Sequence, residues 1–431
     1  MDSSKRRRVE QHDDATDRLG DLPDCLLHDI LSRLGSRQTV QTSLLSRRWR
    51  HLWRDVLRGN VIVNESEFAG EQWERFEDFA DHVLPASIPT ETPHLDAFGL
   101  NLVSQRVTYS CSGRWIRRGL RRCPAAVDIR TAHDVTVSWQ PHWSCLDGSR
   151  PQPDVSAAGL CAAGFTRRLT KLHLVGVGMS ATFLEDLGTY CPVLEDLHIE
   201  NFRMMDDLVC IASPTLRNLA LVQLRDHLAS ANLRITAPLL VRLRLELAYG
   251  GLNRHCVVAG LATGAEPLAL VREALIRLTD TSHHLQRSER RRKKGKLEFL
   301  TSMRAFLALL PNSVKLHLAG FTTTALLEEE SQEFPVLHRL KTLILERCDL
   351  GVEFQALPGI FQNTSDLEKL GLHHCTNPLQ ELLHREDWTW RLEPRRAPCH
   401  AVSVRRHINH TTAGTSRVHE VSPLNQELGG A

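Results

Sequence analysis

The histidines and cysteines are the residues of this chain best suited to chemistry, and their spacing does not form a site. A zinc site needs several such residues at ligand spacing, often completed by a carboxylate. The adjacent pairs His283-His284 and His373-His374, and the spaced pair His407 and His410, have no such neighbours. In a strand, His373, His374 and Cys375 would point alternately to opposite faces. We therefore predict turn-facing polar residues at these positions and no metal.

Nucleotide and redox motifs are missing as well. Gly176-Val-Gly178 lacks the third glycine of a dinucleotide-binding loop, and no P-loop occurs. The eleven cysteines are odd in number, and none lies in a Cys-x-x-Cys pair. With no signal peptide, this usage indicates a reducing compartment, so we expect the nucleus or cytoplasm. The sequence predicts no catalytic residues and no cofactor, and we expect that the chain is not an enzyme.

Length, charge and hydropathy limit the number of domains and the classes of partner. The 431 residues allow two or three ordinary domains, or one small domain followed by an elongated array. A net charge of +2 argues against nucleic-acid or membrane binding by bulk electrostatics. No apolar run reaches the ~18 residues that a spanning helix needs, so we expect no membrane partner.

Residues 17–57 have the pattern of three short helices. Pro23 is typical of a first helical turn, and Gly35 is predicted to end that helix in the left-handed conformation. Val40 and Leu44, four residues apart, indicate one face of a second helix. The apolar positions of the first and third helices are Leu22, Leu26, Leu27, Ile30, Leu31, Leu34, Trp49, Leu52 and Trp53.

So short a helical stretch cannot bury all of these side chains within itself. Domains of this size usually need a metal, disulfides or a partner, and the stretch holds one cysteine, Cys25, and no set of metal ligands. An apolar surface should therefore remain exposed. Such a surface usually marks contact with another protein.

The same stretch resembles the F-box of plant proteins. The resemblance rests on the runs DRLGDLPDCLLHDILSRL and VQTSLLSRRWRHLW. It implies docking on the small adaptor subunit of an SCF-type cullin ubiquitin ligase. The residues that would form either the adaptor interface or the core behind it are Leu22, Pro23, Leu26, Ile30, Leu31, Val40, Leu44, Leu45, Ser46 and Trp49.

Beyond the helices, an L-x-x-L-x-L pattern recurs with the 20–29-residue period of leucine-rich repeats. A weaker copy starts at Pro124 and another at Val314. The clear copies are Leu95, Phe98 and Leu100; Leu169, Leu172 and Leu174; Leu194, Leu197 and Ile199; Leu216, Leu219 and Leu221; Leu240, Leu243 and Leu245; Leu340, Leu343 and Leu345; and Leu367, Leu370 and Leu372.

The repeat spacing predicts a solenoid. The second and third apolar residues of each copy lie two apart on a strand and point the same way, so stacked units form a curved parallel sheet. The predicted fold is α/β: an N-terminal three-helix F-box followed by an irregular leucine-rich-repeat solenoid with helical or irregular return segments. Cys348 and Cys375 occupy the Asn/Cys position of the motif, whose side chain contacts backbone groups at the turn, so we predict a structural role for both.

Two parts of the chain depart from the repeat pattern. Residues 246–312 fit the period poorly and contain the basic run 287–296. Since this run lacks interleaved aromatic residues, we favour a solvated loop over a nuclear-import signal or a nucleic-acid contact. The predicted segments are a disordered basic tail at 1–16, the F-box at 17–57, the repeat domain at 58–376 with degenerate first repeats and a basic insert near 280–296, and a divergent, poorly ordered tail at 377–431.

The resemblance implies a substrate-recognition subunit of the ligase. The F-box would bind the adaptor and through it the cullin, and the repeats would bind a target protein for ubiquitination by other subunits. Two other roles stay open: a non-catalytic F-box scaffold, and a nuclear, nucleic-acid-associated protein that uses the run 287–296. Nucleic acid is the less expected partner, for the reasons given above.

Overall fold

The structure is a computed structural model of the whole chain. It describes residues 22–86, 94–103, 109–131, 167–176, 178–179, 184, 187–201, 203–204, 208–222, 232–249, 268–280, 289–327, 333–351, 354–375, 388–392 and 404–407.

The N-terminal helices are α1 (Asp24–Ser32), α2 (Ser36–Gln41) with the short 3-10 turn η1 (Thr42–Leu44), and α3 (Trp49–Gly59). Apolar residues at helical spacing form a small core of their own, because the spacing places them on facing stripes of α1 and α3. This core consists of Leu27, Leu31, Trp49, Leu52 and Val56.

The prediction for Gly35 is wrong. Helix α1 ends at Ser32, and Gly35 precedes α2 with φ −62° and ψ 156°, an extended conformation open to any residue. A Cβ atom at Gly35 would instead overlap the carboxylate of Glu67. The glycine is therefore explained by close packing, not by a left-handed turn.

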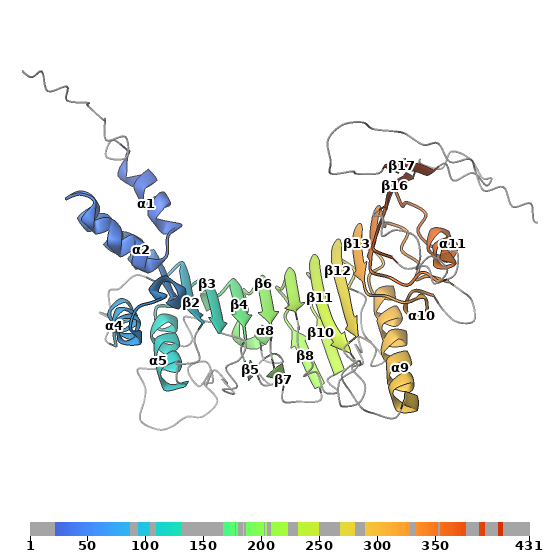
Figure 1. Cartoon of the computed structure of the whole chain (residues 1–431), viewed down its shortest axis with the longest axis horizontal. Helices are drawn as coiled ribbons and strands as arrows, with labels where there is room; N and C mark the ends of the chain where they lie inside the picture. Colours follow the sequence, from blue (N-terminus) through green and yellow to red (C-terminus); the bar gives the residue numbers. More distant parts are fainter. Residues whose placement is uncertain are drawn as a thin grey trace, which may run out of the picture.

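A thirteen-stranded sheet follows the helices and runs along the length of the molecule (Figure 1). Its neighbours are parallel from β1 to β15, and β16 and β17 continue it antiparallel. In order, the strands are β1 (Asn60–Asn64), β2 (Ala97–Leu102), β3 (Ala126–Thr131), β4 (Lys171–Val175), β6 (Asp196–Glu200), β9 (Asn218–Val222), β11 (Arg242–Tyr249), β12 (Glu273–Asp280), β13 (Lys315–Ala319), β14 (Thr342–Glu346), β15 (Lys369–His373), β16 (Trp388–Leu392) and β17 (Val404–His407).

Helices and short strands make up the return segments described. Two small parallel pairs, β5 with β7 and β8 with β10, lie outside the large sheet. These elements are η2 (Glu65–Phe68), α4 (Trp73–Val83), α5 (Tyr109–Leu120), β5 (Gly178–Met179), α8 (Leu187–Tyr190), β7 (Arg203–Met204), β8 (Leu208–Ala212), β10 (Asn232–Thr236), α9 (Glu289–Ala308), α10 (Thr323–Leu326) and α11 (Ala356–Gln362).

The register confirms the predicted solenoid. Each repeat pair sits beside the equivalent pair of the next strand, as Leu172 does beside Leu197 and Leu343 beside Leu370. These side chains are buried in one continuous core that extends from Val61 to Leu372. Stacking thus buries the apolar face that a single repeat would leave in water.

One repeat was missed, because its motif positions carry few leucines. The interpretation that residues 246–312 depart from the repeat is wrong at β12, where Val271, Ala274 and Ile276 are buried at the three motif positions. Strand β1 adds a similar pair, Val61 and Val63, beside Phe98 and Leu100.

The basic run does not form a solvated loop over its described part. Residues 289–296 lie in the first turns of α9, and residues 287–288 fall outside the described part of the chain. The Lys296 ammonium lies 2.9 Å from the carboxylate of Asp280 at the end of β12. Further along α9, Phe299, Met303 and Phe306 pack into the sheet core.

A left-handed residue directly follows several strands. Positive φ angles occur at Gly176, Asn201, Gly320, Arg347 and His374. At Gly320, a Cβ atom would overlap the carbonyl oxygen of Leu278. The backbone therefore leaves each of these strands through the same left-handed conformation. Where the backbone of the preceding repeat lies very close, as at Gly320, only glycine fits.

The prediction for the two cysteines is confirmed. The Cys348 thiol lies 3.6 Å from the carbonyl oxygen of Leu318, and the Cys375 thiol lies 3.3 Å from that of Leu345. Each cysteine therefore contacts the backbone of the preceding repeat.

The ends of the chain are described only in part. Within the predicted C-terminal tail, β16 and β17 extend the sheet, although the sequence indicated no ordered elements there. Residues 1–16 lie outside the described part. Among the helices that the structure describes, none combines the length and the apolar character needed to cross a membrane.

Candidate functional site

Four large apolar side chains lie exposed on the N-terminal helices, which form one end of the molecule (Figure 1). Leu44 is 86% exposed and Leu45 is 65% exposed, and both lie at the end of η1. On α1, Leu26 and Ile30 are four residues apart and therefore share one face. We call Leu26, Ile30, Leu44 and Leu45 the apolar patch.

The structure divides the remaining predicted partner-binding residues between core and surface. Leu31 and Trp49 are buried in the helical core, so they support the surface but do not form it. Leu22 packs against this core and is partly exposed. Exposed or half-buried positions are also held by Pro23, Val40 and Ser46.

The apolar patch suits burial against another protein. Fully burying a leucine or isoleucine side chain contributes about 1.5–3 kcal/mol. In this small domain, these side chains have no place in the core, since the inward positions are already filled by Leu27 and Leu31.

The helices are joined to the first strand by polar contacts. The Ser36 hydroxyl oxygen accepts a hydrogen bond of 2.8 Å from the backbone N–H of Ile62 in β1. The Arg37 guanidinium contacts the Glu67 carbonyl and the Glu71 carboxylate, and lies 4.0 Å above the ring of Phe68. We call these contacts the junction. They place the apolar patch in a defined position relative to the sheet.

Two carboxyl groups at the junction titrate differently. Burial raises the pKa of Glu67, and the nearby charge of Arg37 only partly offsets this effect. At Glu71, the hydrogen bond from Arg37 lowers the pKa. Arg37 therefore pairs with an ionised Glu71 at neutral pH.

The second candidate surface is the outer sheet face, formed by the strand residues that alternate with the buried pairs. In β4, for example, Leu172 and Leu174 are buried, while Lys171 is exposed and His173 is half-buried. The register aligns equivalent outer residues in rows across the strands. The central row contains His173, His198, Ala220, Arg244, Leu275 and His317.

A network of charged residues crosses the outer sheet face. Glu246, only 6% exposed at its side chain, lies 2.6 Å from Arg244 and 3.4 Å from Arg277. Arg277 also reaches Glu346, at 3.3 Å, two strands away. The reach is possible because Ala319, which lies between them in the row, is small.

Glu346 ends this network beside His317, whose Nε2 atom lies 3.1 Å from the carboxylate. Burial alone would raise the pKa of Glu346, but Arg277 and His317 outweigh it and lower that pKa. Burial lowers the pKa of His317, although Glu346 opposes the shift. At neutral pH, the carboxylate is therefore ionised and the imidazole is mostly neutral.

A shallow hollow of about 440 Å³ lies beside this network. Its lining includes the apolar residues Ala220 and Leu275 and the polar residues His198, Arg242 and Arg244. Such a mixture of apolar and polar side chains is typical of surfaces that bind other proteins.

The outer sheet face also gathers possible metal ligands that the sequence analysis missed. His173, His198 and Glu200 each offer a ligand atom, and these atoms lie within 4.8 Å of one another. The analysis compared spacings along the chain, whereas these residues meet across neighbouring strands. The signal is their position in the repeat. His173 and His198 occupy the same position of adjacent repeats, and Glu200 follows His198 by two residues.

Comparison with known families matches both regions. The family model of the F-box domain matches residues 19–60. The family model described as FBD-associated F-box protein At5g56370, LRR repeats, matches residues 131–262.

Relatives extend the similarity over most of the chain. A rice (Oryza sativa subsp. japonica) protein named MEIOTIC F-BOX protein MOF is 40% identical over 367 residues, which cover 83% of this chain and 72% of the relative. A putative F-box/LRR-repeat protein of Arabidopsis thaliana is 25% identical over 85% of this chain and 73% of its own length. A putative F-box/FBD/LRR-repeat protein of the same plant is 32% identical over 48% of this chain and 47% of its own length. This chain belongs to the F-box/leucine-rich-repeat proteins of plants.

Proposed function

We propose that this chain is a target-binding subunit of an SCF-type cullin ubiquitin ligase. The apolar patch binds the adaptor subunit, which links the chain to the cullin, and the outer sheet face binds a target protein. Membership of the F-box family supports the first contact, and the solenoid with its open polar face supports the second.

The observation that carries the proposal is the exposure of the apolar patch beside a filled core. Leu44 and Leu45 are largely exposed, while the core residues Leu27 and Leu31 are 0% exposed. Exposure of such side chains to water is unfavourable. Each one that the adaptor buries fully stabilises the complex by about 1.5–3 kcal/mol.

In this role the chain acts by proximity and performs no covalent step. Holding the target and the ligase on one chain raises the effective concentration of the target near the ubiquitin-loaded enzyme. The junction matters here, because Ser36 and Arg37 fix the apolar patch relative to the sheet. Acid, base and nucleophile are then supplied by other subunits.

Adaptor binding is tested with Leu44→Arg in the full chain. Because Leu44 is 86% exposed, the substitution should leave the fold intact and place a charge in the interface. We expect adaptor affinity, measured by calorimetry or pull-down, to fall at least about tenfold. Val336→Arg, at a half-exposed valine of the repeat domain, is the control and should bind as the unmodified chain does. Unchanged binding by Leu44→Arg would reject the proposed interface.

Target binding is tested by purifying the chain with its associated proteins and measuring their ubiquitination. In the proposed role, Leu44→Arg retains the associated target but loses its ubiquitination. Associated proteins that are never ubiquitinated by the intact complex would indicate a scaffold instead.

A further inference from the structure

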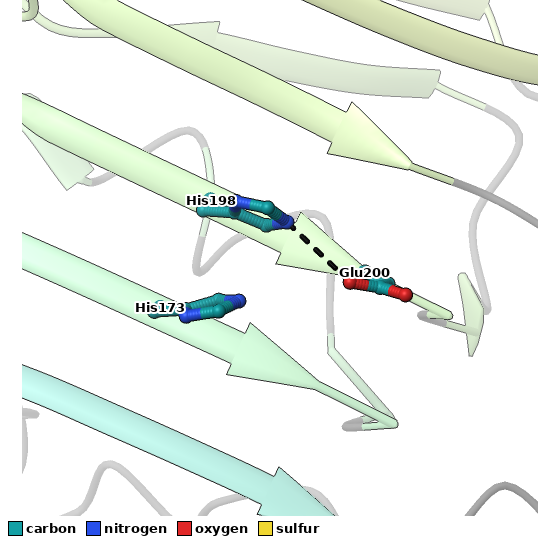
Figure 2. A group of neighbouring side chains, drawn as sticks. All are labelled: His173, His198 and Glu200. Atoms are coloured by element: carbon teal, nitrogen blue, oxygen red, sulfur yellow. Dashed lines mark ion pairs between the residues drawn. The ribbon is translucent and has the colours of Figure 1, made fainter. Parts of the chain in front are cut away.

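Three potential metal ligands meet on the outer sheet face (Figure 2). His173 lies on β4, and His198 and Glu200 lie on the adjacent β6. The parallel register sets His173 directly beside His198, and Glu200 follows two residues later on the same face. The sheet therefore holds the three side chains together without any loop.

The two imidazole rings leave nitrogen atoms without hydrogen bonds. The ring centroids are 4.1 Å apart, and the Nε2 atoms of His173 and His198 are both buried with no hydrogen-bond partner. His198 Nε2 lies 3.6 Å from the Glu200 carboxylate, which is too long for a hydrogen bond. Leaving a buried polar atom unpaired costs about 1–3 kcal/mol.

A further carboxylate orients one of these rings. Asp128 Oδ1 lies 3.4 Å from Nδ1 of His173, the ring nitrogen opposite the unpaired Nε2. Arg130 donates to the same carboxylate at 2.9 and 2.8 Å. Metal-binding histidines commonly donate their second nitrogen to such a carboxylate.

We propose that His173, His198 and Glu200 form a binding site for a divalent transition-metal ion of the zinc class. Two imidazole nitrogens and one carboxylate oxygen are ligands that this class prefers. Bonds of about 2.0–2.1 Å in tetrahedral geometry need donors about 3.3 Å apart, so small side-chain rotations close the present spacing around the ion. Three protein ligands leave a coordination position for water or for a side chain of a bound protein. The proposal adds to the target-binding role and does not depend on it.

The test is a titration of the full chain with Co²⁺, whose visible absorption reports coordination by nitrogen and oxygen. Cysteines are first alkylated, so that thiolates do not contribute. We expect one equivalent of Co²⁺ to bind, and Zn²⁺ to displace it. The substitutions His173→Ala and His198→Asn should each weaken binding at least tenfold, and Asp128→Asn should weaken it about tenfold through the orientation of His173.

His317→Ala is the matched control, because His317 lies in the same row of the sheet but outside the cluster. It should bind Co²⁺ as the unmodified chain does. Circular dichroism without metal shows that each variant is folded, and Glu200→Gln provides a ligand variant of nearly unchanged shape. Absence of binding at micromolar Co²⁺, or equal binding by the cluster variants and His317→Ala, would overturn the proposal.

Discussion

The N-terminal helices and the repeat sheet bury their apolar side chains to different extents. The helices share a core of five buried residues, and further apolar side chains, including Leu44 and Leu45, remain exposed. The sheet has one continuous core, and its outer face carries charged networks such as that of Glu246 and Arg277. In the proposed function, the adaptor covers the exposed side chains of the helices, and the open face of the sheet serves recognition.

The two cores are distinct clusters, linked by the junction and by Arg122, which donates hydrogen bonds to the carbonyl oxygens of Leu57 and Arg58 at the end of α3. If this separation is physical, damage to one core should spare the other.

Leu345→Ala should cause the largest loss. Leu345 is 0% exposed in the middle of the sheet, so its removal leaves a cavity and should lower the free energy of unfolding by about 3 kcal/mol. Leu31→Ala removes an equally buried leucine from the helical core. We expect the main urea transition to stay within about 0.5 kcal/mol in that variant, while amide exchange in α1 accelerates.

Urea unfolding followed by circular dichroism measures the free energy of unfolding, and hydrogen exchange with mass spectrometry measures the amide exchange in α1. Equal losses of stability in the main transition for the two variants would show that the helices and the sheet unfold as one unit. The helical core and the sheet core would then not be independent.

Gly320→Ala should cost about 2 kcal/mol, because it combines a left-handed backbone angle with overlap on the Leu278 carbonyl. Arg347 has a similar positive φ after β14 but carries a side chain already. Arg347→Gly should therefore stabilise the chain slightly, by up to about 1 kcal/mol. Thermal unfolding of both variants measures the effects, and a stable Gly320→Ala variant would contradict the turn geometry described here.

The fold could be predicted because leucine-rich repeats place each strand by a simple spacing rule. Leu343 and Leu345 are two residues apart, so they must share a face, and the repeat aligns them with Leu370 and Leu372. At β12, alanine and isoleucine replace leucine, and the spacing rule failed there although the backbone is the same. The first turns of helix α9 were expected to be a loop, because their basic residues carry no apolar pattern.

The candidate sites were less predictable, since they depend on exposure and on contacts between strands. Spacing put Leu26, Ile30, Leu31 and Trp49 on helices but could not divide surface from core, which is set by how α1 packs on α3. His173 and Glu200 are distant in sequence, and only the strand register brings them together. A sequence alone gives this register once the repeats are aligned, but not the distances.

Ser36→Ala tests the junction itself, with an expected effect of about 1 kcal/mol. Ser36 is 1% exposed, and its hydroxyl is the acceptor for the Ile62 N–H, so the substitution leaves that amide without its partner. We expect faster hydrogen exchange in β1 and a lower unfolding temperature. Ser46→Ala, at an exposed position of the same helical region, is the control and should change neither. Identical exchange of the Ile62 amide in both variants would argue against the junction as a structural link.

The smallest expected effect is a pH dependence confined to the outer sheet face. Because burial lowers the pKa of His317 below 6.5, the unfolded chain binds its proton more tightly than the folded chain does. The stability that the neutral ring contributes is therefore lost as the pH falls below about 6.5. Glu346 has a lowered pKa as well, so its contribution is present above about 4.5 and is lost below that value.

Urea unfolding of His317→Gln at about pH 7.5 and about pH 5.5 measures the first part of this dependence. The unmodified chain should lose stability between the two values, and the variant should lose less, because glutamine does not titrate. His338→Gln, at an exposed histidine, should follow the unmodified chain. Parallel losses in all three proteins would assign the pH sensitivity to other histidines and contradict the contribution of His317.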